Sequence, residues 1–378
     1  MEELRTPNIP TVSVSDCVDI LAELYGNVLK AGMPLKSIPT PFLWGAVGVG
    51  KSQGVRQLAD RLGLATGRRA IVTDVRLLLF NPIDLRGIPV ANNDKTLAVW
   101  LKPSILKMDE SEDCLNILFL DELSAAPQSV QAAAYQICLD RTVGEHALPD
   151  NCIVIAAGNR TTDRSVSFKM PRALCNRLMH FNIKSDFEAW RSWAVNHGID
   201  GRIIGFLGFD HARYATESGE DSSCGRLCQS SDSGELAFAT PRSWEFVSNI
   251  LKAMDCDAEK AHLLISAAVG GDVAIDFENW CKVSENLPSI DNILAGVETK
   301  YPRKHDVLYT LVASMSSAVI SRADKITVAE LQNACDYANR FPKDFIEAFY
   351  EDLNSSEKIR LKLMKCRLPF GFFGNKKV

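Results

Sequence analysis

The sequence lacks a long apolar run, a strong excess of one charge and an internal repeat. No stretch approaches the roughly 18 uninterrupted apolar residues of a membrane-spanning helix. The first residues, Met1–Arg5, do not show the basic and then apolar order of a secretion signal. A net charge of −5 over 378 residues gives no global indication of nucleic-acid binding. These absences predict a cytoplasmic protein that folds around a core and has no membrane partner.

The cysteines give no indication of a disulfide framework. The eleven cysteines are an odd number, and many of them lie in apolar runs, where a thiol behaves as a small hydrophobic group. Cys224 and Cys228 form the one suggestive pair, in a segment rich in glycine and serine. A zinc site would need two further ligands close by. We interpret the pair as solvated loop cysteines, with a metal site as the alternative.

A chain of 378 residues predicts two domains. In the first two thirds, short apolar runs alternate with helical periods. Runs this short and this apolar are typical of strands covered on both faces, as in a parallel sheet, so the first domain is predicted to be α/β with right-handed crossovers. The expected helix covers residues 52–64, and the expected strands are 41–44, 70–79, 115–120, 152–157 and 178–183.

The last third of the chain is expected to be helical. Residues 209–239 interrupt the alternating pattern, and the small and polar segment 219–234 within them predicts that they form a mobile loop. Pro241, with Thr240 as N-cap, predicts the start of a helix. Further helices are expected at 258–269, 304–320, 327–339 and 342–353. The predicted domains are an α/β domain over 1–240, a smaller all-α domain over 241–345 and a basic helix or tail over 346–378.

The end of the chain carries its own charge. Residues 355–378 hold seven basic residues against one acidic residue, a charge of +6, which leaves −11 for residues 1–354. A basic tail on an acidic body could bind nucleic acid or dock on a neighbouring subunit. The alternative is a solvated helix face followed by a frayed terminus.

A glycine-rich segment carries the strongest chemical signal. It matches G-x-x-x-x-G-K-[ST] between an expected strand and an expected helix. Its residues are Gly45, Ala46, Val47, Gly48, Val49, Gly50, Lys51 and Ser52. Glycines let backbone N–H groups turn toward phosphate oxygens, and the following helix directs its positive end at the same anion. We expect Lys51 to contact the β- and γ-phosphates of ATP and the Ser52 hydroxyl to bind Mg²⁺.

Two adjacent carboxylates follow the apolar run 118–120. One acid at the tip of a strand can hold Mg²⁺ through water, and a second beside it can polarise an attacking water. We assign Asp121 to the metal and Glu122 to the water. The paired glutamate favours a hydrolysing ATPase over a GTPase switch.

Asn159 follows the apolar run 152–157 and Gly158. If that strand lies between the strand before the glycine-rich loop and the strand before Asp121, Asn159 faces the γ-phosphate and can orient water. The alternative is an asparagine that makes a local turn hydrogen bond.

Taken with two later segments, 170–178 and 239–244, these motifs resemble those of AAA+ ATPases. They are most similar to the MoxR-type branch, which includes forms from bacteria and their phages. The family order is Walker A, Walker B, sensor 1, arginine finger and sensor 2, and the resemblance covers about residues 20–345. It implies a P-loop NTPase core, with a parallel sheet between helices, followed by a smaller all-α lid.

The resemblance also implies roles for single residues. Asn159 corresponds to sensor 1, Arg177 to the finger that reaches a neighbour's γ-phosphate, and Arg242 to sensor 2 at the start of a lid helix. The chain departs from the family in having Asn176 where an acidic residue is usual and Arg172 where glutamate is frequent. Either Arg172 or Arg177 could therefore be the arginine that acts in trans.

The function implied by the resemblance is ATP hydrolysis in a homo-oligomeric, hexameric ring that remodels or chaperones a protein partner. In this branch the partner often carries a von Willebrand factor A-type domain. Residues 82–87 resemble the loop before an inserted hairpin. One alternative is an AAA+ nucleic-acid motor or loader, supported by the basic tail and by the segment 219–234. Another is a nucleotide-gated scaffold with negligible turnover.

Overall fold

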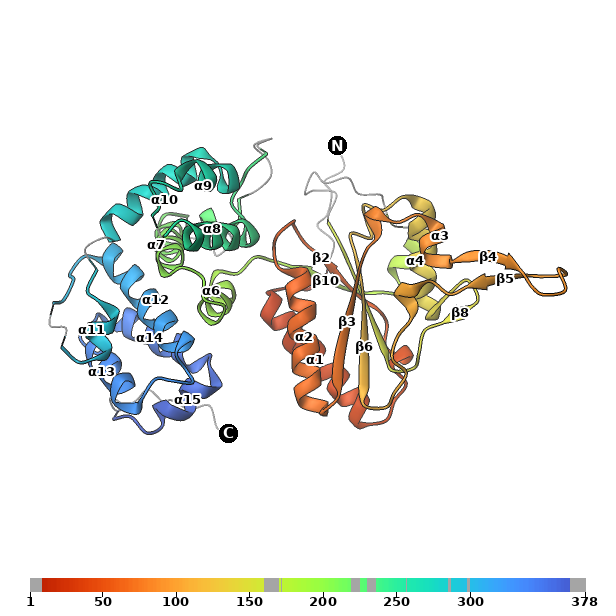
Figure 1. Ribbon diagram of the computed structural model, residues 1–378, viewed down its shortest axis with the longest axis horizontal. Helices are drawn as coiled ribbons and strands as arrows, with labels where there is room; N and C mark the ends of the chain where they lie inside the picture. The colour runs from red at the N-terminus through yellow and green to blue at the C-terminus, as the bar shows by residue number, and fades with distance from the viewer. Residues whose placement is uncertain are drawn as a thin grey trace. The chain divides into compact units, whose positions relative to one another are not determined.

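The computed structural model describes residues 9–159, 170, 172–218, 225–229, 236–255, 257–284, 287–297 and 300–367 (Figure 1). The chain forms two compact units, which are described separately. One comprises Met1–Ser185 with Ser230–Asp232, and the other Asp186–Gln229 with Ser233–Val378. The division after Ser185 lies well before the boundary expected at residue 240.

The first unit is built on six parallel strands in the order β1-β10-β2-β9-β6-β3. The strands are β1 (Thr11–Val12), β2 (Pro41–Trp44), β3 (Arg69–Arg76), β6 (Cys114–Asp121), β9 (Cys152–Gly158) and β10 (Met179–Ile183). Every expected strand is present, which confirms the α/β fold class with a parallel sheet. The strand expected over 70–79 ends earlier than predicted, because Leu77–Leu79 form the 3₁₀ turn η2.

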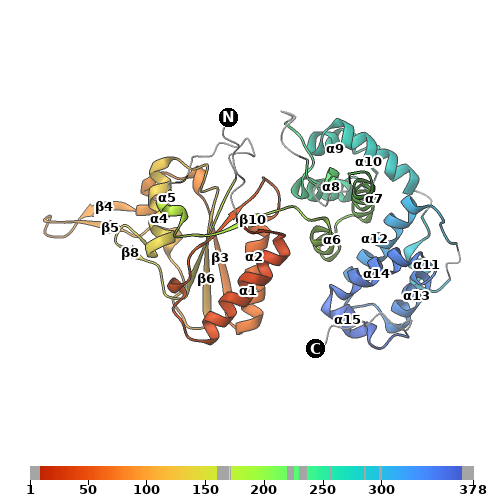
Figure 2. The same ribbon diagram turned by 180° about the vertical axis from the view of Figure 1, so that it is seen from behind.

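Helices cover both faces of this sheet (Figures 1 and 2). Helices α1 (Val14–Lys30) and α2 (Lys51–Thr66) pack on one face, and α4 (Gln128–Asp140) packs on the other. Alternate residues of β6 serve the two faces: Ile117 and Phe119 join the α1 and α2 side, and Leu118 and Leu120 the α4 side. This period of two explains why the strand is apolar throughout its centre.

Shorter elements complete the first unit. They are the 3₁₀ turns η1 (Leu35–Ser37) and η3 (Ser104–Leu106), the helices α3 (Pro82–Arg86) and α5 (Arg172–Cys175), and the strands β4 (Ile88–Ala91), β5 (Ala98–Leu101), β7 (Thr142–Val143) and β8 (His146–Ala147). Strands β4 and β5 form an antiparallel hairpin, as do β7 and β8. The β4–β5 hairpin directly follows residues 82–87, where the resemblance implied an inserted hairpin.

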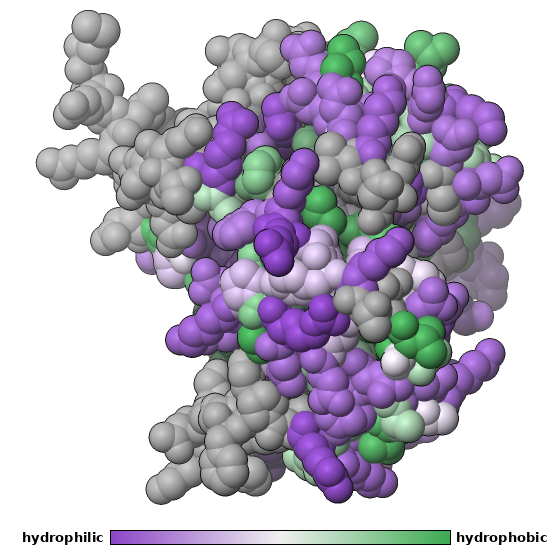
Figure 3. Space-filling model, turned by 90° about the vertical axis from the view of Figure 1, so that its left-hand side faces the viewer, coloured by the Kyte–Doolittle hydropathy of each residue, from purple (hydrophilic) through white to green (hydrophobic). Residues whose placement is uncertain are grey.

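The second unit is helical. Its helices are α6 (Phe187–Asn196), α7 (Gly201–Ser218), α8 (Pro241–Ala253), α9 (His262–Val269), α10 (Gly271–Ser284), α11 (Ile290–Leu294), α12 (His305–Ser321), α13 (Val328–Ala338), α14 (Lys343–Asn354) and α15 (Glu357–Leu363), with the 3₁₀ turn η5 (Gly225–Leu227). Thr240 caps α8 through its hydroxyl and Pro241 occupies the first turn, as predicted. Figure 3 shows a mostly hydrophilic face of this unit, with hydrophobic residues in small separate groups.

Helix α7 corrects one expectation. Residues 209–218 were predicted to belong to a mobile loop, but they continue this helix. A stripe of glycines brings α7 against α12: a Cβ at Gly205 would lie 2.6 Å from Thr310 Cα, and one at Gly201 would lie 2.4 Å from Ser314 Oγ. The small residues therefore serve helix packing. Residues 219–224 and 230–235 of the expected loop lie outside the described residues.

The basic end of the chain is partly folded into the helical unit. Ile359 and Leu363 of α15 are buried. The Lys362 ammonium donates to the carbonyls of Ala323 and Ile326 at 2.8 and 2.7 Å. This part of the expected tail is thus a packed helix, whereas residues 368–378, which include Lys376 and Lys377, lie outside the described residues. Within the described ranges, no helix is long and apolar enough to cross a membrane.

A buried ion pair joins α6 to α14. Arg191 Nη2 lies 2.9 Å from Asp352 Oδ2, and the Asp352 side chain is 5% exposed. Burial raises the pKa of the Asp352 carboxyl to about 6, and the Arg191 guanidinium offsets only part of this increase. The folded state therefore holds the proton more tightly than the unfolded chain, whose aspartate pKa is about 3.9.

We predict that this carboxyl makes the unfolding free energy of the helical unit fall as the pH rises from about 3 to 7, by about 3 kcal/mol in total. Urea unfolding of Asp352→Asn should show a flatter pH dependence than the wild type over this range. The control is Asp324→Asn, because Lys358 lowers the pKa of that exposed carboxyl and its contribution has the opposite sign. An unchanged pH slope in Asp352→Asn would contradict the assignment.

Candidate functional site

The strand order brings the predicted polar residues to one edge of the sheet. Strand β9 pairs with β2 on one side and with β6 on the other, as the interpretation of Asn159 required. Because parallel strands end at the same edge, the residues that follow them lie close together. Lys51 Nζ donates to Asn159 Oδ1 at 3.1 Å, and Ser52 Oγ donates to Asp121 Oδ2 at 3.1 Å. The structure thus brings four predicted site residues into two direct contacts.

The loop between β2 and α2 has a backbone that requires glycine. Gly48 and Gly50 have φ angles of +79° and +103°, which are unfavourable for residues with a Cβ. At Gly45 the constraint is space, since a Cβ there would lie 2.8 Å from the Ile183 carbonyl oxygen. Gly50 is the N-cap residue, and α2 begins at Lys51. The first turn of this helix leaves N–H groups without intrahelical partners, directed at the space inside the loop.

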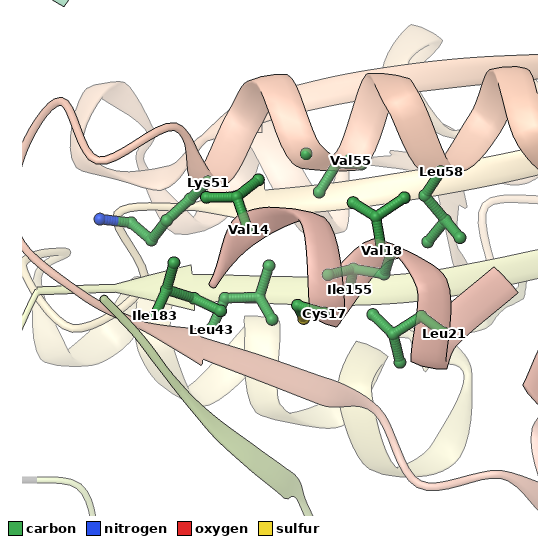
Figure 4. Close-up of a pocket in the computed structure, with 11 residues that line it drawn as sticks. Val14, Cys17, Val18, Leu21, Leu43, Lys51, Val55, Leu58, Ile155 and Ile183 are labelled. Atoms are coloured by element: carbon green, nitrogen blue, oxygen red, sulfur yellow. The ribbon is translucent and has the colours of Figure 1, made fainter. Parts of the chain in front are cut away.

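Lys51 is held inside this loop. Its side chain is buried, and Nζ donates to the carbonyls of Gly45 and Ala46 at 2.6 and 2.9 Å in addition to Asn159. Figure 4 shows that its nitrogen points away from the apolar cavity between α1 and α2, which the lysine stem helps to line. That cavity, of about 10 Å³, holds at most one water. A phosphate group would therefore be bound by the loop and the ammonium, not by this cavity.

The two carboxylates of the acidic pair differ in backbone conformation and in hydrogen bonding. Asp121 accepts from the Ser52 hydroxyl with one oxygen and from the Glu122 N–H, at 2.9 Å, with the other. Glu122 has a φ angle of +58° and starts a turn that leaves the sheet. A non-glycine residue there costs roughly 1–3 kcal/mol, and such strained residues cluster at active sites. Asp121 also affects its neighbour on β3: burial, and then the charge of Asp121, raise the pKa of Asp74.

These residues fit a magnesium ion with bound phosphates. Mg²⁺ is usually held by one or two protein ligands together with phosphate oxygens and water. Ser52 and Asp121 supply such a pair of oxygen ligands, already in contact across two elements. In the described part of the chain, no group of three or more histidine, cysteine, aspartate or glutamate side chains could hold a metal ion by itself. Cys228 is half-buried, and its expected companion, Cys224, lies outside the described residues.

Sequence reasoning missed Ser124, which contacts Asn159 directly. Its hydroxyl donates to the Asn159 carbonyl and accepts from the Asn159 N–H, both at 3.0 Å. The only sequence signal for it is a position two residues after Glu122, in a turn that the pattern of apolar residues does not define. These two bonds hold the main chain of Asn159, while its side-chain oxygen accepts from Lys51.

A second missed group links β2 to the segment that carries Arg177. Trp44 Nε1 donates to His180 Nδ1 at 3.0 Å, and His180 Nε2 lies 2.8 Å from the Cys175 carbonyl oxygen. Since Nδ1 accepts, Nε2 carries the proton in this arrangement. Arg177 itself is exposed in the turn between α5 and β10. The histidine thus connects the strand before the glycine-rich loop with this turn.

The arginines expected to complete the site are placed as follows. Arg172 begins the short helix α5, and residues 160–169 and 171 before and beside it lie outside the described residues. Arg242 is exposed in the first turn of α8, in the helical unit. The roles of Arg172, Arg177 and Arg242 stay predictions.

Comparison with known proteins identifies no family for this chain. No family model matches the chain, and no curated protein matches it. Similar solved structures include PCH-2 from C. elegans (12% identity, 82% of this chain and 70% of that one, TM-score 0.34). A second is a point mutant of RuvB from Thermotoga maritima (14% identity, 84% of this chain and 87% of that one, TM-score 0.36). A third is a Cytophaga hutchinsonii protein described as a candidate ATPase (15% identity, 94% of each chain, TM-score 0.30). At these identities and TM-scores, the similarities do not establish a family.

Two glycines at the ends of α2 provide a matched test of the loop. Gly50 and Gly67 both have positive φ, and a Cβ at either would meet no clash. We predict that Gly50→Ala and Gly67→Ala each lower the unfolding free energy by about 1–2 kcal/mol. Only Gly50→Ala should also weaken binding of ATP, roughly tenfold or more, because it distorts the phosphate-facing loop. Equal ATP affinities in the two variants, measured by calorimetry, would refute this assignment.

Proposed function

We propose that this protein is an AAA+ ATPase that hydrolyses ATP with Mg²⁺. The observation that carries the proposal is the pair of contacts Lys51–Asn159 and Ser52–Asp121, made across three adjacent strand ends. A glycine-rich turn alone would not require an amide and a carboxylate at these positions. Together they provide a cation for phosphate, ligands for a metal and a polar group for water.

Each residue has a defined task in this proposal. The N–H groups of residues 45–52 and the Lys51 ammonium bind the phosphates, and Ser52 and Asp121 hold the metal. Mg²⁺ held there would supply positive charge to offset the charge that develops on the phosphate oxygens. Glu122 accepts a proton from the attacking water, and Asn159 orients that water by hydrogen bonding. Because Glu122 and Asn159 lie at the ends of adjacent strands, both can reach one water molecule.

The finer part of the proposal is a MoxR-type remodelling ATPase that works in the cytoplasm. The order of motifs and the β4–β5 hairpin after residues 82–87 support this branch. The partner would be a protein, with a von Willebrand factor A-type domain as the first candidate. Arg177, with Arg172 as the alternative, would reach the site of the next subunit in a hexameric ring, and Arg242 would sense the nucleotide from the lid.

The two other functions receive less support. In α15, Lys358 pairs with Asp324, and Lys362 binds two carbonyls within its own unit. These basic groups are engaged within the fold, which weakens the case for a nucleic-acid motor that uses this segment. Lys51, Asp121, Glu122 and Asn159 together supply the groups that hydrolysis needs from one subunit, which disfavours a scaffold with negligible turnover.

Glu122→Gln should separate binding from hydrolysis. The amide keeps the shape of the side chain but cannot accept the proton of the attacking water, so we predict an ATPase rate at least about 100-fold lower with ATP affinity retained. Lys51→Ala serves as the contrast, because it removes the phosphate contact and should abolish binding. Radiolabelled ATP that stays unhydrolysed on Glu122→Gln would agree with the assignment, and full turnover would exclude Glu122 as the base.

A mixing experiment tests the shared site. Arg177→Ala and Lys51→Ala proteins should each be inactive alone, because each lacks one part of every site. In a randomly mixed ring, roughly a quarter of the interfaces combine an intact Lys51 with a neighbour's intact Arg177, and activity should return to about that fraction. Arg172→Ala, mixed in the same way, tests the alternative arginine. Failure to complement at any ratio, for both arginines, would rule out a site completed in trans.

A further inference from the structure

One buried hydroxyl satisfies both main-chain polar groups of Asn159. Strand β9 ends at Gly158, which is the last residue paired with β2, so the N–H and C=O of Asn159 lie beyond the sheet ladder. Ser124 Oγ accepts from that N–H and donates to that C=O, both at 3.0 Å. Ser124 is 2% exposed, so water does not compete for these bonds. The orientation of Asn159 therefore depends on this hydroxyl.

The position of the hydroxyl is defined from two further directions. A Cβ at Gly158 would lie 2.7 Å from Ser124 Oγ, so this glycine provides the space that the hydroxyl occupies. Gly158 does not have a positive φ, so its backbone conformation does not require glycine. Glycine is needed here because a side chain would collide with Ser124. From the other side, the Gln131 side-chain amide of α4 donates to the carbonyls of Ser124 and Ala126, at 3.2 and 3.0 Å. The turn that carries Ser124 is thereby tied to a buried helix.

Ser124 also belongs to the turn that begins with Glu122. The left-handed conformation of Glu122 sends the chain across β9, where the Leu123 N–H donates to the Ala157 carbonyl at 2.9 Å. The next residue, Ser124, then reaches Asn159. A continuous series of contacts thus runs from Gln131 through Ser124 and Asn159 to Lys51.

We propose that Ser124 is a positioning residue that fixes the Asn159 amide relative to the Glu122 carboxylate, so that both act on the same water. This inference rests on the proposed ATPase function. The hydrogen bonds of Ser124 go to Asn159 and Gln131 and not to the glycine-rich loop, so we assign Ser124 no direct part in binding the nucleotide. Its loss should therefore lower kcat and leave the KM for ATP nearly unchanged, because misplacement of a reacting group costs rate rather than binding.

The test compares Ser124→Ala with a matched control, Thr40→Ala, in the full-length chain. Thr40 is also buried in the first unit, and its hydroxyl likewise makes two hydrogen bonds: it donates to the Cys138 carbonyl and accepts from Arg141. Thr40 precedes β2, so it lies at the opposite end of that strand from the glycine-rich loop. We expect Ser124→Ala to lower kcat by roughly 10- to 100-fold with KM within twofold. Thr40→Ala should keep kcat within twofold of the wild type. A kcat loss of the same size in both variants would overturn the positioning role.

Two further measurements keep the inference separate from the proposed function. Gly158→Ala retains the Ser124 side chain but places a methyl group 2.7 Å from its hydroxyl oxygen, so it should displace the hydroxyl and reproduce the loss of kcat. Hydrogen exchange of the Asn159 N–H, followed by NMR without nucleotide, should become at least tenfold faster in Ser124→Ala. If the wild type hydrolyses no ATP, the proposed function fails. If the exchange rate of the Asn159 N–H is unchanged in Ser124→Ala, the positioning contact is refuted, whatever the ATPase result.

Discussion

The position of β9 between β2 and β6 is the constraint on which the candidate site depends. Adjacent parallel strands lie about 4.8 Å apart, so residues that follow their carboxyl ends come within hydrogen-bonding reach. Trp44 pairs with Gly158, and Leu120 with Ala156, so the loop, the amide and the carboxylates begin at nearly the same level. With β9 at the edge of the sheet, it would have only one neighbouring strand, and Asn159 could not contact both Lys51 and Ser124. The chemistry proposed for this protein is thus a consequence of strand order.

Burial of the central strands makes this arrangement rigid. Strands β6 and β9 are covered on both faces by apolar side chains, and every residue of β9 is buried. A rigid frame can hold unfavourable backbone conformations at its edge, and Gly48, Gly50 and Glu122 all have positive φ there. The same frame orients polar groups before a ligand binds, which is the condition for electrostatic stabilisation of charge during a reaction.

Much of the fold could be predicted because apolar runs and glycine patterns report local structure. The strands, the start of α2 at the glycine-rich loop and the Thr240 cap of α8 all follow from short segments. Contacts between distant segments could not be predicted, because serine at 124 and histidine at 180 have no local pattern that marks them. The boundary expected at residue 240 was too late because it also depends on a contact between distant segments. The packing of α7 on α12 shows that residues 201–218 belong with the later helices.

The central claim is that these strand ends form a magnesium-dependent ATPase site. The most direct test is the steady-state rate of phosphate release from ATP by the purified full-length protein, measured in excess Mg²⁺ and again after the metal is removed with a chelator. The account predicts turnover that requires Mg²⁺ and returns when the metal is added back, because Ser52 and Asp121 are in contact and in place to hold it. The absence of turnover with Mg²⁺ present, or a rate that the chelator does not change, would contradict it.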